Sequence, residues 1–168
     1  MTKMYKIIAS GFGVGYLKPM PGTYASLLIF IIGYLIKPSL NIIALIIFFI
    51  LLIISYYSIN QIISAEGGSA SGGNYSPPKA GPPLAEINKD PSWIVIDEVL
   101  GSILILIFIP YSLLTYIMAF IIFRLFDGQK IWPINVFNKI KTPLGVIIDD
   151  LLAAIITIFF IYLIKIMF

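Results

Sequence analysis

The chain has 168 residues, of which 60% are hydrophobic and 11% charged, and its mean hydropathy of +1.02 excludes a soluble domain with a polar surface. It indicates an integral membrane protein that forms one domain over residues 1–168. The net charge of +3 is small and the basic residues are scattered, which argues against nucleic acid as a partner. Cysteine and histidine are absent, so any chemistry must come from carboxylates, lysine, arginine and hydroxyls.

The apolar runs predict an all-α fold, a polytopic membrane helix bundle with four or five membrane segments, some of them short or re-entrant. A helix needs about 20 apolar residues to cross the hydrocarbon core of a bilayer. Residues 40–59 supply them, after Pro38 and Ser39, which are typical of helix starts. Residues 24–36 are fewer, so they form either a tilted span or a re-entrant piece. The further apolar segments are residues 91–109, 111–126 and 143–166.

Residues 64–90 interrupt this pattern, and we expect them to form a flexible, solvated loop. They are rich in glycine, proline, serine and alanine, and no isoleucine occurs from Ser64 to Glu86 in a chain otherwise full of it. Residues 67–83 differ most from their surroundings, which leaves open that they are an engineered insertion. We therefore assign no chemistry to this loop.

The basic residues indicate how the bundle is oriented. If five segments cross the membrane, the N-terminus and the loops at 60–92 and 127–142 lie on one side. That side carries most of the cations, namely Lys3, Lys6, Lys18, Lys79, Lys89, Lys130, Lys139, Lys141 and, near its edge, Arg124. The other side carries Lys37 and Lys165. By the positive-inside rule, the first side faces the cytoplasm.

Five carboxylates abut or lie inside the apolar segments, where an unpaired charge is costly. They are Asp97, Glu98, Asp127, Asp149 and Asp150. Two of these segments resemble each other, since DPSWIVIDEVLGSI (90–103) and TPLGVIIDDLLAAI (142–155) align without gaps. Each carries an acid pair that begins six residues after a proline. At a rise of 1.5 Å per residue, both pairs should lie about 9 Å from their helix starts, at matching depth.

Four carboxylates at one level would repel one another without a counter-ion. A divalent cation resolves this repulsion, and all-oxygen ligands favour Mg²⁺, or Mn²⁺, over zinc. We therefore predict that Asp97, Glu98, Asp149 and Asp150 bind metal. Two alternatives stay open: salt bridges that hold the helices together, for which the chain offers one arginine, and a proton or ion relay of the kind found in transporters.

Basic and hydroxyl side chains provide a candidate anion site. Arg124 and Asp127 lie three residues apart, so they share a helix face, and Lys130 follows. A guanidinium binds phosphate oxygens in a bidentate manner, and a lysine adds a point charge. Thr23 and Ser26 follow a glycine-rich stretch at a helix start, where free N–H groups favour an anion. In the predicted topology these groups meet the acids at the cytoplasmic interface, which indicates chemistry on a lipid phosphate.

Four short motifs contain these residues: PGTYAS (21–26), IVIDEVLG (94–101), FRLFDGQKIWPI (123–134) and GVIIDDLLAA (145–154). In order and spacing, the set resembles the motifs of the bacterial phosphatidylglycerophosphatase A family. The similarity covers nearly the whole chain apart from about residues 64–88. The chain departs from the family pattern at three positions, where Ala25 and Ala154 replace glycines and Ile131 replaces a proline.

The resemblance implies a Mg²⁺-dependent, multi-pass phosphatase of the bacterial inner membrane. Its substrate would be phosphatidylglycerophosphate, from which removal of the terminal phosphate gives phosphatidylglycerol. Carried over position by position, the resemblance marks as the site Thr23, Asp97, Glu98, Arg124, Asp127, Lys130, Asp149 and Asp150.

Our hypothesis for the mechanism is a direct attack by metal-activated water, with Arg124 and Lys130 holding the phosphate oxygens. An aspartyl-phosphate intermediate stays open as an alternative. Asp127 would orient Arg124 or act as a base, and Asp149 would contribute to both metal binding and catalysis. Two rival functions stay open. A CDP-alcohol phosphotransferase is suggested faintly by the Asp-Gly pair at 127–128, and a non-enzymatic ion transporter would use the same acids as a relay. The sequence assigns no oligomeric state.

Overall fold

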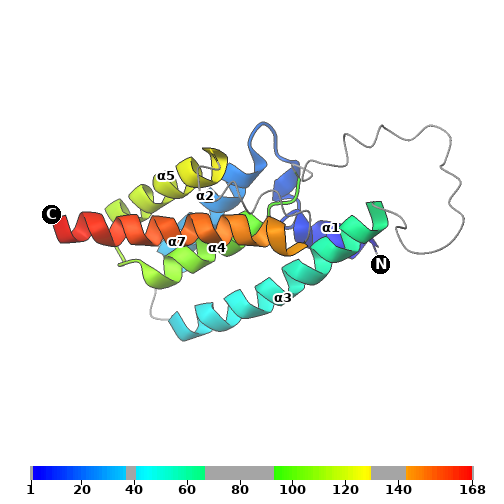
Figure 1. The fold of residues 1–168 in the computed structure, drawn as a ribbon, viewed down its shortest axis with the longest axis horizontal. Helices are drawn as coiled ribbons and strands as arrows, with labels where there is room; N and C mark the ends of the chain where they lie inside the picture. Colours follow the sequence, from blue (N-terminus) through cyan, green and yellow to red (C-terminus); the bar gives the residue numbers. More distant parts are fainter. Residues whose placement is uncertain (1, 37–40, 67–92, 130–142, 168) are drawn as a thin grey trace, which may run out of the picture.

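The computed structural model describes residues 2–36, 41–66, 93–129 and 143–167, and the regular structure in these ranges is entirely helical (Figure 1). This confirms the all-α prediction. The helices are α1 (Thr2–Ala9), the 3₁₀ turn η1 (Val14–Tyr16), α2 (Pro21–Ile36), α3 (Asn41–Glu66), α4 (Ile96–Phe108), α5 (Leu113–Gln129) and α7 (Pro143–Met167).

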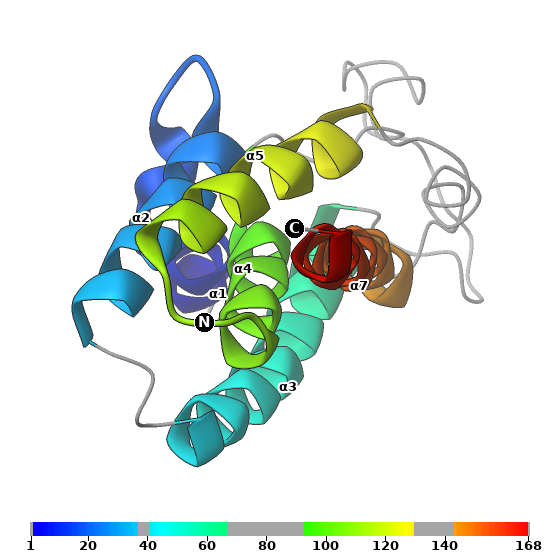
Figure 2. The same cartoon turned by 90° about the vertical axis from the view of Figure 1, so that its left-hand side faces the viewer.

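Helix α4 lies at the centre of the bundle and packs against α7, α2 and α3, with α5 closing the remaining side (Figure 2). Helix α5 also packs along α7, and α1 packs against α3. The helices α2, α3, α4, α5 and α7 run in alternating directions (Figure 1). The starts of α2, α4 and α7 and the end of α5 therefore lie at the same end of the bundle.

Two apolar clusters hold these helices together. The first joins α2, α4, α5 and α7 through Phe30, Ile105, Ile109, Tyr116, Ala119, Phe123, Ala153, Ala154 and Ile161. The second joins α1, α3, α4 and α7 through Ala9, Phe48, Ile59, Ile94, Ile96, Leu100, Val146 and Ile147. Because α4 and α7 contribute to both clusters, they fix the position of the other helices.

In the described part of the chain, two helices are long and apolar enough to cross a membrane, over Ile42–Gln61 in α3 and Leu144–Met167 in α7. Only 22% of the α3 window is buried, and large apolar side chains such as Ile42, Ile46 and Ile53 are exposed around it. A helix that is apolar all round and mostly uncovered is consistent with a lipid environment. Helix α2 is apolar but has 16 residues.

The predicted start of the third apolar segment at residue 91 is wrong. Residues 93–95 are not helical, and α4 begins at Ile96. The Val95 N–H donates to the Ala9 carbonyl oxygen at 2.9 Å, and the Trp93 ring stacks on Tyr16 with centroids 6.0 Å apart. These contacts with the N-terminal region hold residues 93–95 out of the helix.

The prediction that the two acid pairs lie at equal depth from their helix starts is consequently wrong as well. Asp97 and Glu98 lie in the first turn of α4, whereas Asp149 and Asp150 are the seventh and eighth residues of α7. The pairs still approach each other, because α4 packs against α7.

Other helix boundaries differ from the predicted ones by a few residues. Helix α3 continues through Glu66, three residues into the predicted loop, and α5 begins at Leu113 and not at residue 111. The rest of that loop, including the stretch 67–83, lies outside the described residues.

Replacing Phe123 by alanine should lower the free energy of unfolding by about 3 kcal/mol, because this side chain is fully buried in the first cluster and its loss leaves a cavity. Thermal or denaturant unfolding in detergent micelles would measure the change. Leu125→Ala is the matched control, since Leu125 lies on the same helix with 50% of its surface exposed. Equal effects of the two substitutions would contradict this account of the core.

Candidate active site

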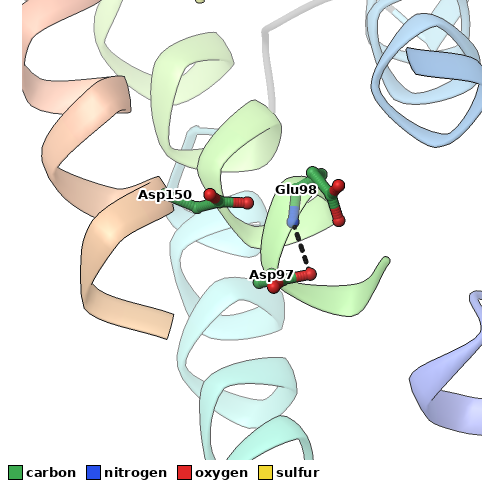
Figure 3. A group of neighbouring side chains, drawn as sticks. All are labelled: Asp97, Glu98 and Asp150. Atoms are coloured by element: carbon green, nitrogen blue, oxygen red, sulfur yellow. Dashed lines mark hydrogen bonds between the residues drawn. The ribbon is translucent and has the colours of Figure 1, made fainter. Parts of the chain in front are cut away.

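Three carboxylates from two helices form a compact cluster (Figure 3). One carboxylate oxygen from each of Asp97, Glu98 and Asp150 lies within 4.8 Å of the other two. Gly101, one turn after Glu98, permits this approach of α4 to α7. A Cβ at Gly101 would lie 3.1 Å from the Asp150 carbonyl oxygen and 2.9 Å from Cζ of Phe123. The small residue therefore lets the two acid-bearing helices pack closely.

The carboxylate cluster has oxygen atoms that the described part of the chain leaves without hydrogen bonds. Glu98 Oε2 and Asp150 Oδ2 are both buried and lack a partner there. A buried carboxylate oxygen without a partner is unfavourable. Together with Asp97, these two side chains form an all-oxygen donor set, which fits a hard divalent cation such as Mg²⁺ or Mn²⁺.

Asp149 lies beside this cluster without being one of its three members. It is buried, and it interacts electrostatically with Asp97 and Asp150. Of the four predicted metal ligands, the structure therefore brings three into one group and places the fourth at its edge.

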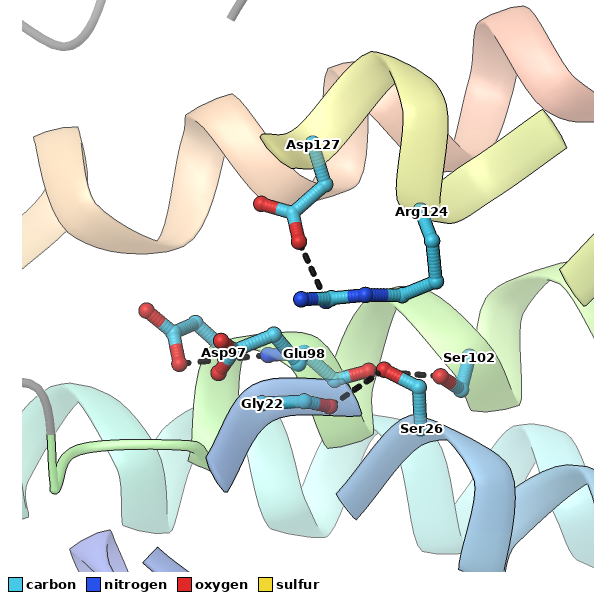
Figure 4. Close-up of polar contacts among 7 residues, drawn as sticks. All are labelled: Gly22, Ser26, Asp97, Glu98, Ser102, Arg124 and Asp127. Carbon is cyan, nitrogen blue, oxygen red and sulfur yellow. Dashed lines mark hydrogen bonds and ion pairs between the residues drawn. The ribbon is translucent and has the colours of Figure 1, made fainter. Parts of the chain in front are cut away.

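The end of α5 places Arg124 and Asp127 over Asp97 and Glu98 (Figure 4). Nη1 of Arg124 donates to Oδ2 of Asp127 in an ion pair, one turn apart on the helix, and both side chains are largely buried. Arg124 also interacts favourably with the Glu98 carboxylate, and Asp127 lies close enough to Asp150 for their charges to interact. The predicted shared face of Arg124 and Asp127 is thus present. Lys130 lies outside the described residues.

The start of α2 forms another wall of the site. A Cβ added at Gly22 would collide with the Glu98 carboxylate, so the glutamate side chain occupies the space that the glycine leaves. The Thr23 hydroxyl is buried without a hydrogen-bond partner among the described residues. Ser26 is fully buried, and its hydroxyl donates to the Gly22 carbonyl oxygen at 2.8 Å. That hydrogen bond ties the Ser26 side chain to the first turn of α2, and its role in phosphate binding stays a prediction.

Two residues of this site do not stand out in the sequence. Gly22 is one of several glycines near the N-terminus, and its contact with Glu98 depends on how α2 meets α4. Ser102 is buried and donates its hydroxyl to the Glu98 carbonyl oxygen at 2.7 Å (Figure 4). Its spacing of four residues after Glu98 is the signal that could have identified it.

Comparison with known proteins places this site in a family. The model of the family described as phosphatidylglycerophosphatase A matches residues 7–70 and 80–165, a range that contains every described residue of the site. The chain belongs to this family. The resemblance of the four motifs is thereby confirmed, and membership implies a phosphatase, a phosphoric monoester hydrolase.

Proteins similar to this chain come from several bacteria. Phosphatidylglycerophosphatase A of Haemophilus influenzae is 31% identical over 161 residues, which cover 95% of this chain and 87% of that protein. A protein of Bacteroides thetaiotaomicron named "Putative phosphatidylinositol-3-phosphatase" is 28% identical over 159 residues, 89% of this chain and 86% of its own. Phosphatidylglycerophosphatase A of Escherichia coli is 36% identical over 73 residues, 42% of each chain. No solved structure matches the chain.

Gly22→Ala should reduce phosphatase activity strongly, because the new methyl group must displace the Glu98 carboxylate from the cluster. Activity in detergent micelles at saturating substrate would measure the loss. Gly33→Ala is the matched control: it adds the same methyl group to α2, where it meets the flexible end of Leu106, far along the helix from the acids. If both variants keep full activity, the contact between Gly22 and Glu98 does not matter for catalysis.

Proposed function

We propose that the chain hydrolyses the terminal phosphomonoester of phosphatidylglycerophosphate, giving phosphatidylglycerol and inorganic phosphate. The observation that carries this proposal is the buried cluster of Asp97, Glu98 and Asp150 next to the Arg124–Asp127 pair, in a chain that belongs to the phosphatidylglycerophosphatase A family. Membership of a phosphatase family favours hydrolysis over cytidine-nucleotide transfer and over an ion relay.

The carboxylate cluster would hold Mg²⁺, or Mn²⁺, through Asp97, Glu98 and Asp150, with Asp149 as a further ligand or a catalytic carboxylate. The unpaired, buried oxygens of Glu98 and Asp150 support this assignment. A bound divalent ion would supply activation of the attacking water and stabilisation of the phosphoryl charge.

Arg124 would bind the phosphate of the substrate. A guanidinium has five N–H donors, and the described ion pair with Asp127 uses one nitrogen, so donors are left for the non-bridging phosphate oxygens. Asp127 fixes the plane of the guanidinium or serves as a base. The buried hydroxyl of Thr23 is a further donor at the start of α2, and Lys130 would add a second positive charge.

The site would lie at the cytoplasmic interface of the bacterial inner membrane, with the N-terminus on the same side and four or five membrane segments in all. The alternating helix directions support this, because they bring the starts of α2, α4 and α7 and the end of α5 to one end of the bundle. The excess of lysine assigned to that end by sequence supports the cytoplasmic side. The lipid tails would stay in the bilayer while the phosphate enters the site.

Purified protein should release phosphate from phosphatidylglycerophosphate, and Arg124→Ala should lower kcat by about 100-fold or more, because it removes the phosphate donors. Phosphate release from a panel that also contains phosphatidic acid and phosphatidylinositol 3-phosphate would measure selectivity. Lys165→Ala is the control, since this exposed lysine lies at the far end of α7. A preference for phosphatidylinositol 3-phosphate, or full activity of Arg124→Ala, would contradict the proposal.

Chelation of divalent ions should abolish activity, and added Mg²⁺ should restore it. In Asp150→Asn, the Mg²⁺ concentration for half-maximal activity should rise by at least roughly tenfold, because one cluster oxygen loses its charge while the side chain keeps its size. Direct Mn²⁺ binding, followed by electron paramagnetic resonance, would show the same loss of affinity without relying on turnover. Unchanged binding in this variant would exclude Asp150 as a ligand.

A further inference from the structure

The segment that links α1 to α2 has an unusual surface. This N-terminal loop, residues 11–20, projects sideways from the bundle at the end where α2 and α4 begin, as both views show (Figures 1 and 2). Its large apolar side chains are turned outward: Phe12 is 85% exposed, and Tyr16, Leu17 and Met20 are each more than half exposed. Water does not stabilise such a surface, so its surroundings must supply an apolar phase.

The backbone of the N-terminal loop holds Phe12 in this outward position. Gly11, Phe12 and Gly13 are consecutive residues in the left-handed region, with φ of 56°, 57° and 99°. Glycine adopts this conformation readily, but a bulky side chain such as phenylalanine does so at a cost. Hydrogen bonds fix the turn: the Phe12 N–H donates to the Ile7 carbonyl at 2.9 Å, and the Gly13 N–H donates to Ser10 Oγ at 3.1 Å.

The charge of this region identifies the kind of surface that it fits. Residues 1–36 contain no aspartate or glutamate, and the charged residue of the N-terminal loop, Lys18, is exposed among the apolar side chains. Lysine between aromatic and aliphatic residues is typical of segments at a membrane interface. There the apolar groups enter the lipid and the ammonium group reaches the phosphates.

We propose that the N-terminal loop is a membrane-surface anchor for anionic phospholipids. Phe12, Leu17 and Met20 insert at the boundary between headgroups and acyl chains, and Lys18 contacts the lipid phosphates. The sideways projection fits this role, because a bundle aligned with the membrane normal places the loop in the plane of the interface. The anchor thereby sets the height of the α2 start relative to the bilayer surface. This inference does not depend on the substrate of the enzyme.

Site-directed spin labelling tests the proposal directly, because the chain has no cysteine. Phe12→Cys and Leu17→Cys would be labelled separately and reconstituted in nanodiscs of phosphatidylcholine with phosphatidylserine, a lipid that is neither the proposed substrate nor the proposed product. Both labels should be several-fold more accessible to oxygen than to a water-soluble nickel complex, at a depth of about 5–10 Å. Ile46→Cys on the exposed face of α3 is the reference for a label in lipid, and its spectrum confirms that the bundle is intact.

Reversing the charge of Lys18 tests whether the loop recognises anionic lipid or only an apolar phase. Adding Lys18→Glu should shift both labels toward water in discs that contain phosphatidylserine and leave them in place in pure phosphatidylcholine. Labels at 12 and 17 that face water in both discs would overturn the proposal, as would dipolar broadening that shows a second copy of the chain on the loop. If the wild-type protein has no phosphatase activity, that result contradicts the proposed function, and the depth of the labels still tests the anchor.

Discussion

Repulsion between buried carboxylates is the constraint on which the rest of this structure depends. Asp97, Glu98 and Asp150 meet at the interface between the central helix and α7, and Asp127 and Asp149 lie beside them. Within the described ranges, Arg124 is the one cation shown interacting with this group, and Asp127 already shares it. In an apolar bundle such like charges are stable together only if bound cations or protons reduce their net charge. The fold thus concentrates negative charge at one point, which the proposed divalent cation and the Arg124 guanidinium would both offset.

Glycine determines how closely the acids approach. At Gly101 the absence of a side chain lets α4 pack against the backbone of α7, and at Gly22 it makes room for the Glu98 carboxylate beside α2. Both contacts involve the central helix, so a small rotation of α4 would move two carboxylates at once. Ser102 restrains that helix locally by donating to the Glu98 carbonyl oxygen. The geometry of the site therefore depends on packing between helices more than on any single ion pair.

The parts of this architecture that follow from local signals could be predicted from the sequence. Long apolar runs located α3 and α7, and the three-residue spacing of Arg124 and Asp127 predicted their shared face. The start of α4 could not be predicted, because a hydrogen bond from Val95 to the distant Ala9 carbonyl sets it. The positions of the acid pairs relative to their helix starts could not be predicted for the same reason. Contacts between helices, which local patterns do not encode, account for these differences.

The unequal lengths of the helices have a consequence for how a lipid phosphate would reach the acids. Helix α4 has 13 residues and spans about 20 Å, less than the roughly 30 Å of a hydrocarbon core. Helix α7 begins seven residues before Asp150, so it extends about 10 Å beyond the acids at that end. With the bundle aligned to the membrane normal, as we propose, the acids lie below the level at which α7 enters the bilayer. The phosphate of the proposed lipid substrate would then descend toward the proposed metal ligands while its acyl chains stay in lipid. Hydrolysis would take place at a depth where water is limited and electrostatic interactions are strong.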